Sequence, residues 1–463
     1  MNILGVSAGF HDAAVSVIDT DGNILFASHS ERYSKKKNDA DICAELIQEL
    51  YGYDIGHVAY YERPWLKQLR QWYAGQGIEW SKITAERVLR QQLRPLILSG
   101  KTISTHNHHL SHAAAGFQTS PFREATVVVI DAIGEWDTVT IWKADYDHRG
   151  HAQYRKLWGQ RYPHSVGLMY SAITQRVGLH PLDEEYITMG MAGWGSAELK
   201  EYLADQLVED AGEIRLKHNL HTGVPEGFMS GVKFEDIAAS AQAVTEELIG
   251  NIMRRARDFG VSKNLVYMGG VALNCLANRL LGEYFDSTWI MPCPGDAGSS
   301  VGAAALAYGH RINWRSAYLG HCIPGDYPVA DLVSELLGRS IVGVASGRAE
   351  FGPRALGNRS LLADPRGTEI KDRVNEIKRR QKFRPFAPVI LEEHVHDYFD
   401  MPQGWNNSRY MQVIAQCQRP DLFPAIVHVD GTSRVQTVPA DGSGIRQLLE
   451  AWYDQTGCPM LLN

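Results

Sequence analysis

The sequence predicts an α/β protein in which one strand-rich unit is duplicated and a smaller α/β domain follows. The first thirty residues alternate between apolar segments and turns, in the order NILGV, SAGFHD, AAVSVI, DTDGN and ILFAS. The same order returns as ATVVVI, DAIGEWD, TVTIWKA and DYDHRGH, so residues 5–9 correspond to residues 130–134. Such duplicated units with a tight, glycine-containing first turn are typical of actin-like, ribonuclease-H-like ATPase folds, because backbone N–H groups of the turn face a phosphate. Hairpins are common, so two unrelated hairpins remain the alternative.

The rest of the chain predicts helices around further strands. Residues 61–93 mix aromatic and basic side chains, and they predict an amphipathic helix packed by its tryptophans, with a nucleic-acid surface as the alternative. From residue 237 to residue 310 the pattern is helix, strand, glycine loop and helix. The segment that follows, residues 310–328, shows no clear helix or strand pattern and contains the best candidate for a domain linker. We therefore expect a first domain over residues 1–325 and a second over residues 329–463.

The composition favours a soluble protein that stays in the cytoplasm and away from membranes. Of 463 residues, 44% are hydrophobic and 21% are charged, and no segment approaches the roughly 18 unbroken apolar residues of a membrane span. The N-terminus, MNILGVSAGFHD, lacks the basic region of a signal peptide. The six cysteines form no CxxC pair, which disfavours a disulfide framework and a structural zinc site. The net charge of −7 gives no indication of a nucleic-acid binder.

The segment HNHHLSHAAAGF concentrates four histidines and predicts the start of a helix. Asn107 suits an N-cap, and His108 and His112 share one helix face because they are four residues apart. Asp131 ends an apolar strand, and Asp296 lies in a loop that opens a helix, so both carboxylates are presented at element ends. Two histidines with one or two aspartates suit iron(II), manganese or catalytic zinc. Ordinary surface or capping histidines are the alternative.

A glycine loop, MGGVALN, runs from Met268 to Asn274 and follows an apolar strand. Glycines there let the backbone approach a phosphate or a nucleoside closely. A tight strand-to-helix turn without any ligand accounts for the same residues equally well. The loop by itself therefore leaves both interpretations open.

Motifs along the whole chain resemble those of one enzyme family. They are, in order, GFHDAA, SERYSKKK, HHLSHAA, DAIGEWDT, TMGMAGWG, GGVALN, GDAGSSVGAA, GRAEFGPRALGNRSLLADPR, FRPFAP, HVDGTSRVQTV and TGCPMLLN. Together they resemble the ATP-dependent O-carbamoyltransferases of the antibiotic and nodulation-factor type. The N-terminal domain of that family is similar to the universal tRNA threonylcarbamoyl transferase, and its C-terminal domain is YrdC-like.

The resemblance implies a two-step reaction. Carbamoyl phosphate and ATP first form carbamoyl-adenylate in the YrdC-like domain, and the N-terminal domain then passes the carbamoyl group to a hydroxyl, which gives a carbamate ester and AMP. A divalent metal, for which we expect iron(II), is implied at His108, His112, Asp131 and Asp296, where it would hold and polarise the adenylate phosphate. Magnesium could accompany ATP. The implied general base is His11. The implied nucleotide contacts are Gly190, Gly193, Gly269, Gly270 and Asn274.

The second domain carries the implied activation chemistry. The segment NEIKRRQKFRPFAP matches a YrdC-type K-x-R arrangement at Lys378 and Arg380, followed by Arg384, and these three are implied to be catalytic. From residue 348 to residue 384 there are eleven Lys or Arg against five acids, which suits phosphate recognition. A solvated helix face is the alternative for the basic residues from Lys371 to Arg380. Arg354 and Arg359 lie among apolar residues, where unpaired charge is costly, and with Lys378 and Arg380 they are the predicted carbamoyl-phosphate ligands.

The sequence departs from the family pattern at its end. In the family, TGCPMLLN continues into a T-S-F-N segment that completes the YrdC-type site, whereas this chain stops at Asn463. We therefore expect a YrdC-like domain that is truncated at its C-terminus, with activation impaired or completed by another chain. A second departure is Ala132, where glycine is usual.

The acceptor is not encoded in the motifs, because acceptor identity depends on loops. A small-molecule hydroxyl, as in a sugar or a natural product, is the first expectation. DNA with hydroxymethylated bases is the second, and Lys67, Arg70, Trp72, Trp80 and Arg87 would then form its binding face. Other interpretations are a tRNA threonylcarbamoyl transferase, a non-catalytic or partner-dependent nucleotide-binding homologue, and a sugar kinase of the same superfamily. A homo-oligomer is compatible with all of them.

Overall fold

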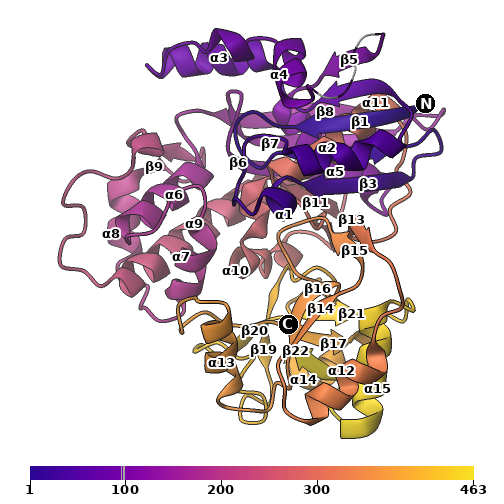
Figure 1. Cartoon of the computed structure of the whole chain (residues 1–463). Helices are drawn as coiled ribbons and strands as arrows, with labels where there is room; N and C mark the ends of the chain where they lie inside the picture. Colours follow the sequence, from indigo (N-terminus) through magenta and orange to yellow (C-terminus); the bar gives the residue numbers. More distant parts are fainter. Residues whose placement is uncertain (95, 97, 99) are drawn as a thin grey trace.

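The computed structural model describes residues 1–94, 96, 98 and 100–463. Its first sheet has five strands in the order β3-β2-β1-β4-β5 (Figure 1). Strand β1 pairs antiparallel with β2 and parallel with β4, while β2 pairs antiparallel with β3 and β4 pairs parallel with β5. The strands are β1 (Asn2–Ser7), β2 (Ala14–Ile18), β3 (Ile24–His29), β4 (Ile55–Tyr60) and β5 (Thr102–Thr105).

A second five-stranded sheet repeats this arrangement in the order β8-β7-β6-β11-β12. Strand β6 pairs antiparallel with β7 and parallel with β11, and the two outer pairs, β7 with β8 and β11 with β12, match their counterparts as well. The repeated order and direction confirm the predicted duplication of an actin-like unit. The strands are β6 (Glu124–Gly134), β7 (Asp137–Tyr146), β8 (Ala152–Arg161), β11 (Asn264–Met268) and β12 (Ser287–Trp289).

Two buried helices, α5 (His108–Thr119) and α11 (Ser299–Tyr308), pack against each other between the two sheets. Helix α11 lies on β1 and β2, and α5 lies on β6 and β11. A Cβ at Gly302 would overlap the Ser111 carbonyl oxygen, so glycine is what permits this close crossing. The crossing brings together the start of α5 and the loop that precedes α11.

Four further helices pack beside the second sheet and share a hydrophobic core with β6, β7 and β11 (Figure 1). They are α6 (Val166–Arg176), α7 (Glu185–Ala192), α8 (Lys200–Leu207) and α9 (Phe234–Asp258). The long helix α9 faces this core with residues spaced three or four apart, as an amphipathic helix does: Ile237, Ala241, Val244, Leu248 and Ile252. Among the described residues, none of the helices combines the length and apolar composition that crossing a membrane requires.

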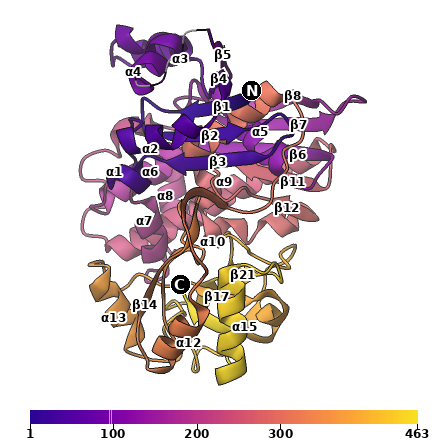
Figure 2. The ribbon, with the colours of Figure 1, turned by 45° about the vertical axis from the view of Figure 1, so that its right-hand side comes forward.

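The C-terminal part is a smaller α/β unit that lies below the two sheets in both views (Figures 1 and 2). Its central strand β17 pairs parallel with β21 and antiparallel with β22, and helices α12 and α15 pack together over this sheet. A second small sheet has the order β18-β19-β20. These elements are β17 (Pro388–Leu391), β18 (Phe399–Asp400), β19 (Ile414–Cys417), β20 (Thr432–Arg434), β21 (Gln436–Val438), β22 (Met460–Leu462), α12 (Val329–Leu337) and α15 (Gly444–Thr456).

A strand pair joins the two parts of the chain. Strand β13 (Tyr318–Ile323) pairs antiparallel with β15 (Gly347–Glu350), so the division expected between residues 325 and 329 falls between two paired strands. A second pair consists of β14 and β16. The remaining elements are α1 (Glu31–Ser34), α2 (Ala44–Gln48), α3 (Pro64–Tyr73), α4 (Ala85–Gln92), α10 (Cys275–Asn278), α13 (Ile370–Ile377), α14 (Val395–Tyr398), β9 (Val208–Asp210), β10 (Arg215–Leu216), β14 (Val342–Ala345) and β16 (Arg359–Leu362).

Helix α3 turns polar side chains inward. Lys67 and Arg70 are 8% and 5% exposed, whereas Trp72 is 60% exposed, so the prediction that tryptophans pack this helix is wrong. The cause lies in tertiary contacts: Lys67 Nζ pairs with the Glu62 carboxylate, and Arg70 Nε donates a hydrogen bond to the Glu135 carbonyl oxygen. Because both cations are buried, they do not belong to an exposed basic face of the kind expected for DNA.

Candidate metal centre and anion-binding cavity

Four side chains from different elements converge between the two sheets. His108 Nε2 lies 3.2 Å from Asp131 Oδ2 and 3.3 Å from Asp296 Oδ1. His112 Nε2 lies 3.1 Å from His108 Nε2 and 3.2 Å from Asp296 Oδ1. One ligand atom of each residue therefore lies within 4.8 Å of the others. The structure brings together all four side chains that were predicted as metal ligands.

The start of α5 fixes the two histidines. The Asn107 side chain accepts a hydrogen bond from the Leu110 N–H, as an N-cap does, and the helix begins at His108. His112 follows one turn later on the same face. The cap predicted from the sequence is therefore present, and it aims both imidazoles at one point.

The two carboxylates are held at element ends. Asp131 lies near the end of β6, and its Oδ1 accepts a hydrogen bond from the Gly270 N–H at 3.1 Å. Asp296 opens the short helix that leads into α11. Burial alone would raise the pKa of Asp296, but the charge of His108 holds that pKa well below its usual value. Burial would likewise lower the pKa of His108, and Asp296 and Asp131 raise it well above its usual value.

These four side chains, which we call the donor set, fit a divalent cation: His108, His112, Asp131 and Asp296. Asp131 and Asp296 are 8% and 5% exposed, and the two imidazoles are at most 1% exposed. Two imidazole nitrogens only 3.1 Å apart both face carboxylate oxygens, which places four donor atoms around one point. Nitrogen and carboxylate ligands in this number suit iron(II), manganese or catalytic zinc. The choice of iron(II) among these metals stays a prediction.

His11 lies at the edge of the donor set. Its Nε2 is 3.4 Å from Asp296 Oδ2 and its Nδ1 is 3.3 Å from Asp12 Oδ2, while about half of the side chain remains exposed. Desolvation acts to lower the pKa of His11, but Asp296 and Asp12 outweigh it and raise the pKa to about 9. His109, which follows His108 in α5, does not join the donor set, because its Nδ1 forms a hydrogen bond with Thr140 Oγ1 at 2.9 Å.

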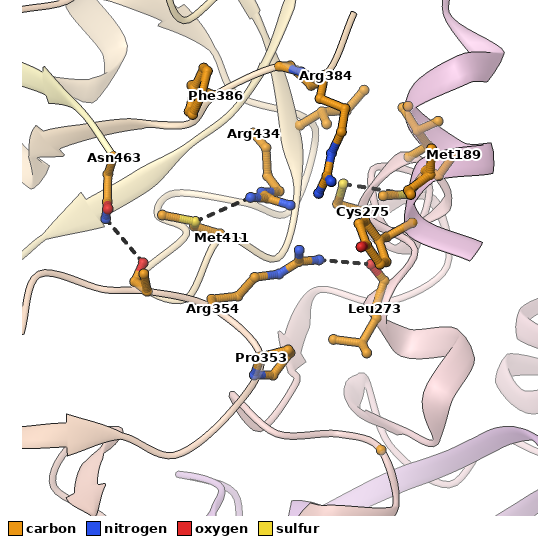
Figure 3. Close-up of a pocket in the computed structure, with 18 of the residues that line it drawn as sticks. Met189, Leu273, Cys275, Pro353, Arg354, Arg384, Phe386, Met411, Arg434 and Asn463 are labelled. Carbon is orange, nitrogen blue, oxygen red and sulfur yellow. Dashed lines mark hydrogen bonds between the residues drawn. The ribbon is translucent and has the colours of Figure 1, made fainter. Parts of the chain in front are cut away.

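A cavity of about 490 Å³ lies between segments next to the donor set and the C-terminal part. On the N-terminal side it is lined by the end of α7 and by Asp12, Gly295 and Ala297, which are the chain neighbours of His11 and Asp296. The opposite wall comes from residues 353–355, 378–386, 411–414 and 428–434. Figure 3 shows three guanidinium groups extended into this space from the C-terminal side, those of Arg354, Arg384 and Arg434.

Lys37 lines the N-terminal side of this cavity and pairs with Asp183. Five further basic side chains, which we call the basic cluster, line it from the C-terminal part: Arg354, Lys378, Arg380, Arg384 and Arg434. Among the described residues, no carboxylate forms a salt bridge with any of them. Removal from water and then the charges of neighbouring arginines lower the pKa of Lys378 to about 8 and that of Arg380 to about 10. Five positive charges gathered in a cavity without salt-bridge partners are typical of an anion-binding site.

Arg359 lies apart from this group. It donates hydrogen bonds to backbone carbonyl oxygens of four residues, which are His321, Ser346, Gly347 and Asn358. The cost of removing this charge from water is thus offset inside the protein. The structure therefore does not bring Arg359 to the cavity with the other predicted carbamoyl-phosphate ligands.

Arg434 is a cavity residue that sequence reasoning did not single out. It lies at the end of β20, within the motif HVDGTSRVQTV, and its Nη2 contacts Met411 Sδ at 3.7 Å. The signal that could have found it is its place in one of the motifs that carry the family resemblance. Arg354 itself reaches across to the Leu273 carbonyl oxygen at 3.5 Å.

The residues predicted as nucleotide contacts fall into two groups. Gly190 and Gly193 line the cavity. A Cβ at Gly193 would overlap the His428 imidazole, so glycine allows the end of α7 to meet the C-terminal part. The described residues that line the cavity do not include the other three, which are Gly269, Gly270 and Asn274.

Those three have internal contacts instead. The Gly270 N–H binds Asp131, and the Asn274 side chain exchanges two hydrogen bonds with the Gln242 amide at 3.0 and 3.1 Å. Gly269 has a φ of 92°, and a Cβ there would overlap the Ile130 carbonyl oxygen. The loop thus holds β11 close to β6 and positions a carboxylate of the donor set.

We expect Gly269→Ala to lower the free energy of unfolding by at least about 2 kcal/mol, because it adds backbone strain and a steric overlap. Urea denaturation measures this change. Gly52→Ala is the matched control, since its added Cβ meets no described atom within 4 Å, and it should change the free energy of unfolding by less than about 0.5 kcal/mol. Equal denaturation midpoints for the wild type and Gly269→Ala would contradict this packing role.

Comparisons with known proteins agree with the motifs. The family described as carbamoyltransferase N-terminus matches residues 71–305, and the family described as carbamoyltransferase C-terminus matches residues 333–463. The uncharacterized protein sll1178 of Synechocystis sp. is 32% identical over 100% of this chain and 90% of its own length. The nodulation protein NolNO of Sinorhizobium fredii is 29% identical over 98% of this chain and 73% of its own length.

A relative named for its activity is the 3'-hydroxymethylcephem-O-carbamoyltransferase of Amycolatopsis lactamdurans, which is 29% identical over 98% of this chain and 90% of its own length. Among solved structures, the activator of the 2-hydroxyisocaproyl-CoA dehydratase from Clostridium difficile with bound ADPNP is 14% identical. It covers 66% of this chain and 94% of its own, with a TM-score of 0.38. From the two family matches and these relatives, we conclude that the chain belongs to the carbamoyltransferase family of enzymes.

Proposed function

We propose that the protein is an O-carbamoyltransferase that makes carbamoyl-adenylate from carbamoyl phosphate and ATP and passes the carbamoyl group to a hydroxyl. The observation that carries this proposal is the cavity of about 490 Å³, because a single space is lined by both the basic cluster and the neighbours of Asp296. Carbamoyl-adenylate is prone to hydrolysis, and a route inside the protein limits its contact with water.

The basic cluster suits the activation step. One water molecule first cleaves carbamoyl phosphate to carbamate and phosphate. A carbamate oxygen then attacks the α-phosphorus of ATP and displaces pyrophosphate, which gives carbamoyl-adenylate. Both substrates are polyanions, and arginine binds phosphate through two parallel hydrogen bonds. Lys378 and Arg380, together with Arg384, would hold the phosphate groups while these bonds break and form.

The donor set between the sheets suits the transfer step. His108, His112, Asp131 and Asp296 would hold the divalent metal, for which we propose iron(II), and the metal would polarise the adenylate phosphate. A metal bound by Asp296 would offset the negative charge that raises the pKa of His11, and the half-exposed His11, then neutral, would take the proton of the acceptor hydroxyl. The hydroxyl oxygen then bonds to the carbamoyl carbon, and AMP leaves.

The acceptor we propose is the hydroxyl of a small molecule. The Amycolatopsis relative is named for a hydroxymethyl acceptor, which supports oxygen as the atom that receives the carbamoyl group. DNA with hydroxymethylated bases is the second candidate. Its support is weaker, because the net charge is −7 and because Lys67 and Arg70 are buried.

We expect the affinity for carbamoyl phosphate to fall as the pH rises through about 8, where free Lys378 loses its proton. A bound dianion favours the charged lysine, so binding takes up a proton above this pKa and weakens by up to about tenfold per pH unit. Titration calorimetry between pH 7 and pH 9 measures the change. Lys378→Arg should flatten the profile because arginine stays protonated, and an unchanged slope in that variant would contradict the role of Lys378.

The test of the function incubates the protein with ATP and carbamoyl phosphate, without acceptor, and follows AMP, pyrophosphate and phosphate with and without added iron(II). Carbamoyl phosphate-dependent release of pyrophosphate and phosphate, with AMP from hydrolysed adenylate, supports activation and justifies an acceptor screen that includes hydroxymethylated DNA. A folded protein that binds ATP without any turnover would contradict activation by this chain. Threonylcarbamoyl transfer to bulk tRNA would contradict the choice of carbamoyl donor.

A further inference from the structure

A buried carboxylate, Glu62, lies directly behind one histidine of the donor set. It follows β4 and is 0% exposed. Its Oε2 lies 3.3 Å from His108 Nδ1, on the side of the ring opposite to the atom that meets Asp131 and Asp296. A carboxylate of this kind, outside the donor set and in contact with a ligand, can decide how that ligand is presented.

The contact determines which nitrogen of the imidazole carries the proton. An ionised carboxylate can only accept hydrogen bonds, so His108 donates its Nδ1–H to Glu62. Nε2, the other ring nitrogen, then faces the convergence point of the four side chains, where a bound cation would replace its proton and take its lone pair. His112 differs, because its Nδ1 is buried without a hydrogen-bond partner among the described residues. Of the two histidines, His108 is the one that this carboxylate orients.

Lys67 fixes the carboxylate in turn. Its Nζ lies 3.3 Å from both Glu62 oxygens, and it is also 3.0 Å from the centroid of the Phe10 ring, next to His11 in the chain. Burial of an unpaired cation is costly, and the pairing with Glu62 offsets this cost. Helix α3 can therefore bury Lys67 on its inward face. The helix therefore supplies a cation whose position depends on Glu62 and on the loop that carries His11.

We infer that Glu62 is a positioning residue for the metal centre: held by Lys67, it keeps His108 in the orientation and tautomer that present Nε2 to a divalent cation. This inference rests on the proposed metal-binding role of His108. Carboxylate partners of ligating histidines raise ligand basicity, and their loss typically weakens metal affinity by about 10–100-fold. Glu62 touches neither carbamoyl phosphate nor the acceptor in this scheme, so its effect is exerted through His108.

The test measures the affinity of the whole chain for cobalt(II) and zinc(II), without substrates, by competition with a chromophoric chelator. Glu62→Gln keeps the shape and a neutral acceptor and should weaken affinity by about tenfold, and Glu62→Leu by about a hundredfold. The visible absorption of bound cobalt(II) should change in both variants. Glu350→Gln is the matched control. Glu350 is 1% exposed and accepts hydrogen bonds from the backbone N–H groups of residues 356, 358 and 359, none of which belongs to the donor set. The affinity of this variant for both metals should equal that of the wild type.

The second part of this test uses Lys67→Met, measured in the same metal-affinity assay. If Lys67 acts by holding Glu62, the Glu62→Gln/Lys67→Met double variant should bind cobalt(II) no more weakly than the weaker single variant. Equal affinity and equal spectra in Glu62→Gln and the wild type would overturn the inference, as would equal losses in Glu62→Gln and Glu350→Gln. A wild-type protein that binds no metal would overturn the metal assignment itself. Metal binding without any carbamoyl chemistry would contradict the proposed reaction and leave the positioning role supported.

Discussion

His108→Ala and His112→Ala should each release the bound metal and abolish carbamoyl transfer. Each substitution removes one of four donors and leaves Asp131 and Asp296 facing each other in a site where both are nearly buried. Loss of a direct ligand should exceed the effect of losing a supporting residue, so we expect metal affinity to fall by more than about a hundredfold. Metal content measured on the purified protein, together with AMP release from supplied carbamoyl-adenylate and an acceptor, checks both parts.

His109→Ala is the matched control for this experiment. His109 belongs to the same helix, is 0% exposed, and pairs with Thr140 instead of the donor set. It should lose stability through its cavity but retain the metal. Full metal occupancy in both His108→Ala and His112→Ala would refute the assignment of these histidines as ligands.

The duplicated fold was predictable because its signal is local. Each unit is recognisable in the sequence by apolar strand segments separated by turn residues. The structure repeats the order and direction of five strands in the two units. The convergence of the four predicted metal ligands was predictable for a similar reason. His108, Asp131 and Asp296 lie at or near element ends, where a polar side chain is presented, and His112 follows His108 one turn later on the same helix face. The crossing of α5 and α11 brings them together.

Helix α3 shows where pattern reasoning fails. Its tryptophans predicted a packed apolar face, yet the inward face carries Lys67 and Arg70. Their partners, Glu62 and Glu135, lie outside the helix, so nothing within the helical period could reveal them. An ion pair with Glu62, just before the helix, and a hydrogen bond to the distant Glu135 carbonyl oxygen overrode the local preference for burying aromatic side chains.

The basic residues of the C-terminal part show the same limit. Arg354 and Arg359 have similar sequence surroundings, and both were predicted to bind phosphate. In the structure Arg354 extends into the cavity, while Arg359 donates to the carbonyl oxygens of Asn358, Ser346, Gly347 and His321, three of which lie 12 to 38 residues away. Arg434 reaches the cavity from a strand about fifty residues further along the chain than Arg384. Which arginine stays without a partner is decided by folding of the whole domain.

Lys378→Ala and Arg380→Ala should block formation of carbamoyl-adenylate and leave transfer from supplied carbamoyl-adenylate intact. Both side chains belong to the basic cluster of the cavity, and Arg380 is anchored there by its hydrogen bond to Asn375 Oδ1 at 2.6 Å. Removing one donor that stabilises developing charge typically costs about 100–1,000-fold in rate, so pyrophosphate release should fall by that factor. The proposed transfer step would use His11 and the donor set between the sheets, which neither substitution touches.

Lys382→Ala separates this effect from a general loss of positive charge. Lys382 lies in the same segment, its side chain is 68% exposed, and it is not among the described residues that line the cavity. It should retain both steps. Equal loss of activation and transfer in Lys378→Ala would mean that the two reactions are not divided between the two ends of the cavity. Loss confined to activation would place carbamoyl phosphate at the basic cluster, because that is the only step in which its phosphate takes part.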